Sequence, residues 1–410
     1  MKITILCSGD ELLDGRVINK NQAIIARLLW EAGYGVSQGV AIGDALPQLV
    51  TAMENSQVQS DIVICTGGLG PTDDDRTVEA LSLMSELKLV RSAEIEKRLW
   101  TFYQQRRQIM PESNLKQADM PQGSTIIPNR TGTAVGIQCH VKKNNRQVWW
   151  FLLPGVTREM TTMVTDYIIP FLDQNVIGYK QNRQLTTFKC VGVGESAISD
   201  RLQDFYPLPE GLEIRYQVPY PEVHVQLSAT GAGLISGYDH HVTQIRQLLH
   251  DCCYATGSDT FAAVIVQKLQ DQHQTLAVAE SCTGGRIAQM ITAIPGSSAV
   301  FLQGVVAYHN DAKSQLLGVD TDLIRDYGAV SEPVALAMAD GIMKKSGADI
   351  GLAVTGIAGP AGGTAEKPVG TVCIAMVTKA GTETSDTHYF SGEREQIQIR
   401  SAYAVLAQLF

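Results

Sequence analysis

A serine in a predicted strand-to-helix turn is the first residue of this sequence that could do covalent chemistry. Ser281 follows the short apolar run 275–279 and comes just before Thr283, Gly284 and Gly285. A serine at such a turn points out of the sheet edge, and backbone N–H groups at the start of the helix can stabilise an oxyanion. The pattern predicts a hydrolase site centred on Ser281.

A serine nucleophile needs a base, and no histidine of this chain fits a Ser-His-Asp triad. His309 is the nearest candidate, and it lies between Tyr308 and Lys313 across a second predicted strand-to-helix turn. A buried lysine can have a lowered pKa and act as a base, while a neighbouring tyrosine relays the proton. We therefore expect Lys313 and Tyr308 to activate Ser281.

Four further turns rich in small residues lie in the same third of the chain, at 295–298, 328–331, 355–360 and 367–371. Each of them alone could be ordinary loop geometry. Together they predict a pocket with many free backbone N–H groups, and such a pocket suits a phosphate and a ribose.

Two Gly-rich acidic turns come after predicted strands near the N-terminus, at 8–15 and 66–77. Glycines let backbone N–H groups approach a phosphate, and the start of the next helix favours an anion. The three aspartates at 73–75 could hold a hard divalent cation. The alternative is a tight turn with an Asp-rich helix cap. The occurrence of two such turns favours phosphate or metal binding.

The composition is that of a globular protein. The chain has 410 residues, enough for two or three domains, and 44% of them are hydrophobic. A net charge of −9 argues against direct nucleic-acid binding, which needs clustered lysine and arginine. We expect no signal peptide and no membrane span. The eight cysteines form no CxxC pair, so we expect reduced thiols and a cytoplasmic location.

Predicted strands and helices alternate over the first part of the chain and again after residue 260. This alternation favours parallel βαβ units, with ligands at the carboxyl ends of the strands. Residues 184–251 differ, because their predicted strands and helices are separated by proline-marked bends. We expect an α/β fold with domains at 1–172 and 256–410, and a small α+β module at 173–255 that spaces or dimerises them.

The N-terminal motifs resemble those of a known family. They are Gly-Asp-Glu-Leu-Leu at 9–13, Thr-Gly-Gly-Leu-Gly-Pro-Thr at 66–72 and Leu-Pro-Gly-Val at 153–156. Together they are similar to the MoaB/MogA-like molybdopterin-binding domain and, more closely, to the N-terminal domain of the CinA family. The resemblance implies an ADP-ribose pyrophosphatase that uses a divalent metal (Mg, Mn or Co) held by Asp74 and Asp75. The other residues implied for this site are Gly9, Asp10, Glu11, Asp44, Gly67, Gly68, Gly70, Thr72 and Thr77.

The C-terminal motifs resemble the C-terminal domain of the same family, a nicotinamide mononucleotide (NMN) amidohydrolase. They include Ala-Glu-Ser-Cys-Thr-Gly-Gly at 279–285 and Thr-Gly-Ile-Ala-Gly-Pro at 355–360. The resemblance covers essentially the whole chain and implies hydrolysis of NMN to nicotinate mononucleotide and ammonia without a cofactor. Ser281 would be the nucleophile, with Ser298 as the alternative nucleophile or a polar support. The residues implied for substrate binding are Thr283, Gly284, Gly285, Thr355, Gly356, Ala358, Gly359, Arg394 and Arg400.

Three interpretations stay open at this point. The first is a bifunctional NAD-salvage hydrolase that acts on NMN and ADP-ribose. The second is an accessory protein in competence or DNA damage that works by binding partners. The third is molybdopterin binding by the N-terminal domain without pyrophosphatase activity. We expect small-molecule nucleotides as ligands, no membrane partner and a homodimer.

Overall fold

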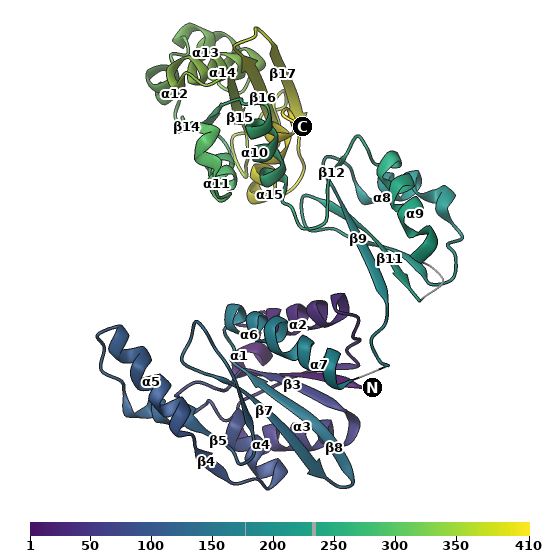
Figure 1. Cartoon of the computed structure of the whole chain (residues 1–410). Coiled ribbons are helices and arrows are strands. Elements are labelled where there is room, and N and C mark those ends of the chain that lie inside the picture. Colours follow the sequence, from purple (N-terminus) through teal and green to yellow (C-terminus); the bar gives the residue numbers. More distant parts are fainter. Residues whose placement is uncertain (177, 232–234) are drawn as a thin grey trace. The chain divides into compact units, whose positions relative to one another are not determined.

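The computed structural model describes residues 1–176, 178–231 and 235–410, and it forms two compact units (Figure 1). The first unit is Met1–Arg183 and the second is Gln184–Phe410. The second unit contains two separate sheets, one in the middle module, which runs from strand β9 to strand β12, and one in the C-terminal domain, which begins at helix α10.

The sheet of the first unit has the strand order β2-β1-β3-β8-β7-β6. Strands β2, β1, β3 and β8 are parallel, while β7 and β6 are antiparallel additions at one edge. The order reverses at β1, because β2 and β3 lie on its two sides, and ligands of doubly wound sheets bind at such a point. The strands are β1 (Ile3–Ser8), β2 (Gln38–Ile42), β3 (Ile62–Thr66), β6 (Thr125–Ile127), β7 (Gly136–Lys143) and β8 (Arg146–Leu153), with the short pair β4 (Leu89–Arg91) and β5 (Asp119–Pro121) outside the sheet.

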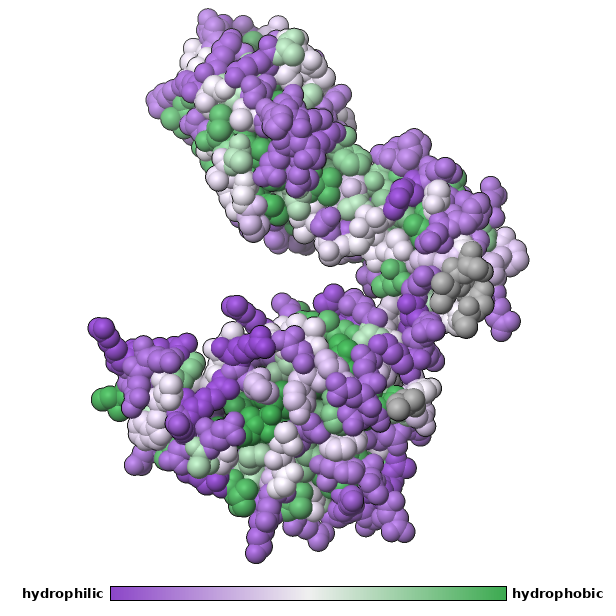
Figure 2. Space-filling model, viewed as in Figure 1, coloured by the Kyte–Doolittle hydropathy of each residue, from purple (hydrophilic) through white to green (hydrophobic). Residues whose placement is uncertain are grey.

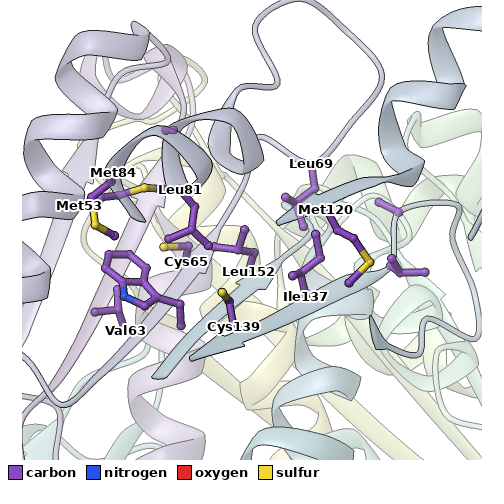
Figure 3. Close-up of a cluster of buried hydrophobic side chains, with 14 of the residues drawn as sticks. Met53, Val63, Cys65, Leu69, Leu81, Met84, Met120, Ile137, Cys139 and Leu152 are labelled. Carbon is purple, nitrogen blue, oxygen red and sulfur yellow. The ribbon is translucent and has the colours of Figure 1, made fainter. Parts of the chain in front are cut away.

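Helices cover both faces of this sheet, and alternate residues of each central strand are buried on opposite sides. On β3, Val63 and Cys65 join the core under α3, α4 and α5 (Figure 3), whereas Ile62 and Ile64 join the core under α2, α6 and α7. This double burial explains why the strand is apolar throughout. The helices are α1 (Asp10–Leu13), α2 (Lys20–Glu31), α3 (Leu46–Gln59), α4 (Thr77–Ser85), α5 (Ala93–Gln105), α6 (Thr157–Met163) and α7 (Ile169–Asn175).

The middle module has a four-stranded sheet in the order β10-β11-β9-β12 with two helices and its own core. Its strands are β9 (Arg183–Cys190), β10 (Leu212–Gln217), β11 (Val223–Thr230) and β12 (Cys253–Thr256), and its helices are α8 (Glu195–Arg201) and α9 (Ile235–Leu248). The predicted α+β character is present, and β12 was not foreseen because its four residues carry no alternating pattern.

The C-terminal domain has a five-stranded sheet in the order β14-β13-β15-β16-β17. Strands β14, β13 and β15 are parallel and the last two are antiparallel. Again the order reverses at the first strand, β13, which lies between β14 and β15. The strands are β13 (Leu276–Glu280), β14 (Phe301–Val306), β15 (Ile350–Gly356), β16 (Thr371–Thr378) and β17 (Glu383–Tyr389).

Six helices of this domain pack against the two faces of the sheet. Helices α10, α11 and α15 contribute to one core and α12, α13 and α14 to the other. Their bounds are α10 (Phe261–Asp271), α11 (Arg286–Thr292), α12 (Asn310–Leu317), α13 (Thr321–Tyr327), α14 (Glu332–Ser346) and α15 (Arg394–Ala407).

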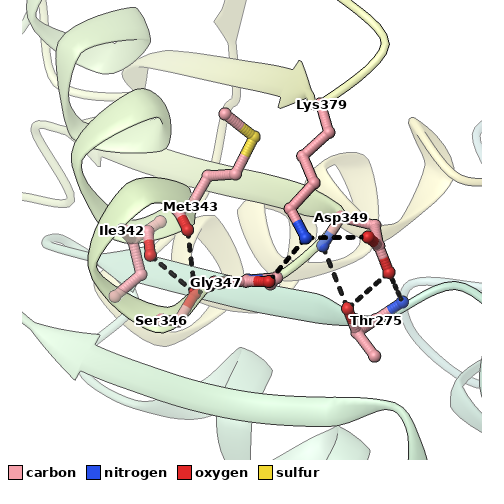
Figure 4. A network of polar contacts seen from close by, with 8 residues as sticks. Thr275, Ile342, Met343, Ser346, Gly347, Asp349 and Lys379 are labelled. Atoms are coloured by element: carbon pink, nitrogen blue, oxygen red, sulfur yellow. Dashed lines mark hydrogen bonds and ion pairs between the residues drawn. The ribbon is translucent and has the colours of Figure 1, made fainter.

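A polar network fixes the amino ends of β13 and β15 (Figure 4). The Asp349 carboxylate accepts from the Thr275 backbone N–H at 2.9 Å and the Thr275 hydroxyl at 2.6 Å, and Lys379 Nζ lies 3.0 Å from its other oxygen. These hydrogen bonds, with Thr275 contributing most, lower the pKa of Asp349 to about 2. The network fixes the register of β13 and β15 at their amino ends. Ser281 lies at the opposite, carboxyl ends of the same strands.

The predicted α/β fold class is confirmed by this topology. The boundary predicted at residue 172 falls inside α7, which continues to Asn175. In the described part of the chain no helix is long and apolar enough to cross a membrane. Figure 2 shows hydrophilic residues over most of the visible face, with hydrophobic residues in scattered groups.

Candidate active site

Ser281 follows β13 directly, at the carboxyl end of the parallel strands. It is 7% exposed, and its backbone N–H donates to Val354 O on β15 at 3.0 Å. The next turn is closed by the Gly284 N–H, which donates to Ser281 O at 3.2 Å. Gly284 and Gly285 have φ values of 65° and 98°, a left-handed conformation that glycine adopts without strain. The sequence therefore places a serine at the sheet edge because two glycines allow the chain to turn there.

Glu280, which precedes the serine, occupies the helix start that was predicted to bind an oxyanion. Its carboxylate is fully buried and accepts from the backbone N–H groups of Gly285, Ile287 and Ala288 at 2.9, 3.1 and 2.8 Å. These N–H groups of the α11 start are thus already bonded within the protein. Sequence reasoning missed Glu280, although a glutamate at the end of an apolar strand is an unusual buried charge.

Lys313 is the partner of Ser281. The side chain extends from α12, is 2% exposed, and places Nζ 3.1 Å from Ser281 Oγ and 3.1 Å from Ala307 O. Burial lowers the pKa of Lys313, since a charged ammonium is poorly solvated there. A neutral amine has one lone pair, so Lys313 can donate to Ala307 O and accept the hydroxyl proton of Ser281.

Tyr308 does not lie where a proton relay requires. Its hydroxyl is 2.6 Å from Arg394 Nη2, its residue is 58% exposed, and among the described residues it has no hydrogen bond to Ser281 or Lys313. Arg394 also donates to Gly359 O at 2.6 Å. The structure therefore joins the exposed Tyr308 and Arg394 with Gly359, and Lys313 is the basic side chain in contact with Ser281.

Thr355 and Gly356 flank Ser281 at the end of β15. The Thr355 hydroxyl is buried and donates to Ala329 O at 2.8 Å, so it anchors the 328–331 turn. Gly356 packs so closely against Cys282 that an added Cβ would lie 3.1 Å from its Sγ. Both residues thus shape the wall of the site. Ala358, two residues further on, is also buried.

Two predicted site residues lie elsewhere. Ser298 is exposed and precedes the amino end of β14, whereas Ser281 follows the carboxyl end of the parallel neighbour β13. The strand length between them spans on the order of 13 Å, so Ser298 cannot replace Ser281 within this domain. Arg400 stacks on Tyr220 of the middle module, with its guanidinium carbon 5.3 Å from the ring centre. It lies six residues, or about 1.7 turns, beyond Arg394 on α15, and it lines a different cavity from the serine.

Two contacts complete the surroundings of the serine. Gln398 on α15 donates to Cys282 O at 2.8 Å, a contact that no motif predicted. The Thr283 hydroxyl oxygen is buried and has no hydrogen-bond partner among the described residues. The backbone N–H groups of Cys282 and Thr283 likewise have no acceptor within this part of the structure. The N–H of the residue after a serine nucleophile is a common oxyanion donor.

The first unit carries a separate cavity of about 800 Å³ at the carboxyl ends of β1, β3 and β8. Eight of the predicted residues line it: Gly9, Glu11, Asp44, Gly67, Gly68, Gly70, Asp74 and Asp75. Gly67 and Gly68 have φ values of 105° and 64°, and a side chain at Gly67 would clash with Ser8 at the end of β1, whereas one at Gly68 would clash with Thr77 at the start of α4. The predicted Gly-rich turns therefore do meet at one cavity.

The three remaining predicted residues, Asp10, Thr72 and Thr77, form hydrogen bonds with residues that line the cavity. Asp10 and Asp44 exchange backbone-to-carboxylate hydrogen bonds of 3.0 and 3.1 Å. Thr77 is buried and donates to Gly67 O at 2.9 Å. The Thr72 N–H and hydroxyl both donate to one oxygen of Asp75, at 2.9 and 2.5 Å. Asp75 thus holds the loop, and one of its two oxygens is already used.

The acidic residues of the cavity fit a cation only in part. Burial raises the pKa of Asp44, and the nearby carboxylates of Asp10, Glu11 and Asp74 act in the same direction. Carboxylate oxygens are the ligands that Mg²⁺ prefers. Within the described ranges, however, no three Asp, Glu, His or Cys side chains converge as a ligand set. One or two carboxylates together with substrate phosphates are a usual Mg²⁺ environment, and the lining is compatible with that arrangement.

Asn21 and Glu159 also line the cavity, and sequence reasoning missed both. Asn21 donates to Gly155 O at 2.7 Å and accepts from the Thr157 hydroxyl at 2.8 Å, which ties α2 to the loop after β8. Glu159 accepts from Asn129 at 2.6 Å. Both residues lie outside the glycine motifs themselves, in the helices that follow two of them, so no motif indicated them.

The two units thus combine a doubly wound domain that has an acidic cavity of about 800 Å³ with an α/β domain that has a buried serine–lysine pair. The family model described as "CinA C-terminal domain" matches residues 258–410, and the one described as "Probable molybdopterin binding domain" matches 4–174. The chain belongs to the CinA family.

Relatives support this assignment over the full length. A CinA-like protein of Syntrophotalea carbinolica is 41% identical over 410 residues, covering 100% of this chain and 98% of the relative. One from Geotalea uraniireducens is 40% identical over 411 residues, covering 99% and 96%. A solved structure of a competence/damage inducible protein from Agrobacterium tumefaciens is 43% identical, covers 36% of this chain and 91% of its own, and has a TM-score of 0.36.

Proposed function

We propose that the C-terminal domain is an amidohydrolase that converts NMN to nicotinate mononucleotide and ammonia. The observation that carries this proposal is the buried Lys313 Nζ at 3.1 Å from Ser281 Oγ, with a lysine pKa lowered by burial. A neutral amine held against a serine hydroxyl is an activated nucleophile. The choice of a nicotinamide nucleotide rests on the resemblance to the CinA family, and the geometry supports only a serine hydrolase mechanism.

In the first step, Ser281 Oγ attacks the carboxamide carbon and Lys313 Nζ takes the hydroxyl proton. The carbonyl oxygen gains negative charge and accepts a hydrogen bond from the Cys282 N–H. This N–H donates to no backbone acceptor among the described residues. The C–N bond then breaks, and the proton on Lys313 passes to the leaving nitrogen, which departs as ammonia. The product of this step is an ester on Ser281.

In the second step, water attacks the ester carbon while Lys313 takes one of its protons. The ester bond breaks, Ser281 regains a proton and the free acid leaves. The exposed Arg394 contacts the Tyr308 hydroxyl and Gly359 O. We propose that its guanidinium binds the 5′-phosphate of the nucleotide.

The test is ammonia release from NMN by the purified full-length chain, with and without a chelator. We expect turnover in both conditions and its loss in Ser281→Ala. Ser298→Ala is the matched control, because that serine lies at the opposite edge of the sheet, and it should retain turnover. Normal turnover in Ser281→Ala would exclude the serine mechanism.

We propose further that the N-terminal cavity hydrolyses ADP-ribose to AMP and ribose 5-phosphate when a divalent cation is bound. The glycine turns offer backbone N–H groups to the diphosphate, and Asp44 and Asp74 are the carboxylates that would hold the cation. When bound, the cation would polarise the phosphoryl oxygens. Asp75 lines the same cavity, and the oxygen that does not accept from Thr72 could also contact the cation.

This second activity is tested by AMP release from ADP-ribose with Mg²⁺, Mn²⁺ or Co²⁺. We expect cleavage in the parent and its loss in Asp74→Asn, while ammonia release from NMN is unchanged. A parent chain that is inactive with all three metals would contradict the proposal. Fluorescence of a bound pterin would then identify molybdopterin binding as the role of this cavity.

A further inference from the structure

A second cavity of about 500 Å³ lies inside Gln184–Phe410, between the middle module and the C-terminal domain. Its volume is in the range of small-molecule sites. The loop after β9, the turn between β10 and β11, the end of β17 and one face of α15 form its walls. Most of the lining is apolar or aromatic, and none of the residues 281–285 belongs to it. It is therefore separate from the serine site.

Arg400 gives this apolar cavity a positive charge. Its guanidinium carbon lies 5.3 Å from the centre of the Tyr220 ring, and it forms no ion pair in the part of the chain that the structure describes. Glu195 also lines the cavity, but it is exposed and is not bonded to Arg400. A guanidinium on an aromatic wall binds phosphate or carboxylate with two parallel hydrogen bonds.

The lining also contains two stacked aromatic rings. The rings of His388 and Phe390 have centroids 5.5 Å apart and 7° between their planes. A ligand that combines a planar ring, which packs on the aromatic and apolar lining, with an anionic group for Arg400 would satisfy both features. A nucleoside monophosphate has this chemistry.

Helix α15 connects this cavity with the serine site. Arg400, Tyr403 and Ala404 line the cavity, while Gln398 of the same helix donates to Cys282 O beside the nucleophile. The helix is also fixed to the middle module, because the Tyr403 hydroxyl donates to the buried Glu222 at 2.8 Å. A ligand that shifts α15 would thus change both its contacts in the cavity and the Gln398 contact beside Ser281.

We propose that this cavity binds a nucleoside monophosphate and that the bound ligand changes turnover at Ser281 through α15. The binding half stands on the cavity alone. The regulatory half rests on the proposed deamidase function.

Binding is tested by calorimetric titration of full-length Ser281→Ala with AMP, GMP and UMP. We expect at least one to bind. Arg400→Gln and the cavity-filling Ala404→Phe should each weaken binding about tenfold or more. Arg215→Gln is the matched control, because that exposed arginine of the middle module pairs with Glu213, and it should bind normally.

Three results would overturn the binding site. They are the absence of binding by all three nucleotides up to roughly 1 mM, unchanged binding in Arg400→Gln, and unchanged binding in Ala404→Phe. A circular dichroism spectrum equal to that of the parent shows that each variant is folded.

Regulation is tested by NMN turnover with and without the bound nucleotide. We expect a change in kcat/KM in the parent chain and in Arg215→Gln, and none in Ala404→Phe. Equal responses in the parent and Ala404→Phe would overturn the regulatory half. A parent that binds the nucleotide but never releases ammonia from NMN would contradict the proposed function and leave the binding site standing.

Discussion

The N-terminal cavity and the Ser281 site occupy equivalent places in their sheets and differ in charge and burial. Each lies at the carboxyl end of the first strand of its domain, where the strand order reverses. The N-terminal site is an open acidic cavity lined by glycine turns, whereas the C-terminal site is a buried serine–lysine pair. The same topology therefore supports either phosphate and cation binding or nucleophilic attack, depending on the residues in the turn after the strand.

The largest expected effect is the loss of NMN deamidation, but not of ADP-ribose cleavage, when Lys313 is replaced. In Lys313→Met the base is lost and the volume is nearly kept, so ammonia release from NMN should fall by about 10²–10⁴-fold. ADP-ribose cleavage should be unchanged, because the other unit contains no part of this pair. Lys313→Arg is the companion variant, and its permanently charged guanidinium should be equally inactive. Substantial deamidation by either variant would exclude Lys313 as the base.

The next effect concerns Asp44, a carboxylate of the N-terminal cavity. Asp44→Asn keeps the shape but removes a charge, so the metal concentration needed for half-maximal ADP-ribose cleavage should rise by about tenfold or more. A metal titration measures this shift. Asp204→Asn, an exposed aspartate of the middle module, is the control. An unchanged metal requirement in Asp44→Asn would remove that residue from the cation site.

Both activities should depend on pH, because each needs one group in its deprotonated form. Burial lowers the pKa of Lys313 from 10.5, and the neutral base exists only above that lowered pKa. Burial raises the pKa of Asp44 from 3.8, and the cation needs the ionised form, which exists above that raised pKa. Both activities should therefore be lost on acidification, each as its own group becomes protonated. Profiles of kcat/KM for the two substrates measure both limbs, and an activity that persists unchanged on acidification would contradict the assignment of its group.

The smallest expected effect is on stability and concerns Glu222. Its carboxylate accepts from the hydroxyls of Tyr254 and Tyr403 at 2.7 and 2.8 Å. Glu222→Ala leaves both buried hydroxyls without this acceptor, which should lower the free energy of unfolding by about 1–3 kcal/mol. Thermal unfolding of the full chain should show a fall of about 2–4 °C per kcal/mol. An unchanged midpoint would mean that water replaces the carboxylate.

Local sequence patterns determined most of the fold and part of each site. The apolar runs at β1, β3 and β13, followed by Gly-rich turns, were sufficient to predict parallel sheets with residues at their carboxyl ends. Ser281 and the cavity glycines could be named for the same reason, because a positive φ or a close backbone approach requires glycine locally. These predictions depend on residues that are neighbours in the chain.

Only the tertiary structure decided which distant groups meet. Lys313 reaches Ser281 because β14 pairs with β13, whereas Tyr308 turns to Arg394 instead. Ser298 is separated from Ser281 by the length of that same pairing. The burial of Glu280 under the α11 start was equally invisible, since no sequence pattern shows which backbone N–H groups a buried carboxylate will meet. Burial and contact depend on packing between elements, and packing has no local signature.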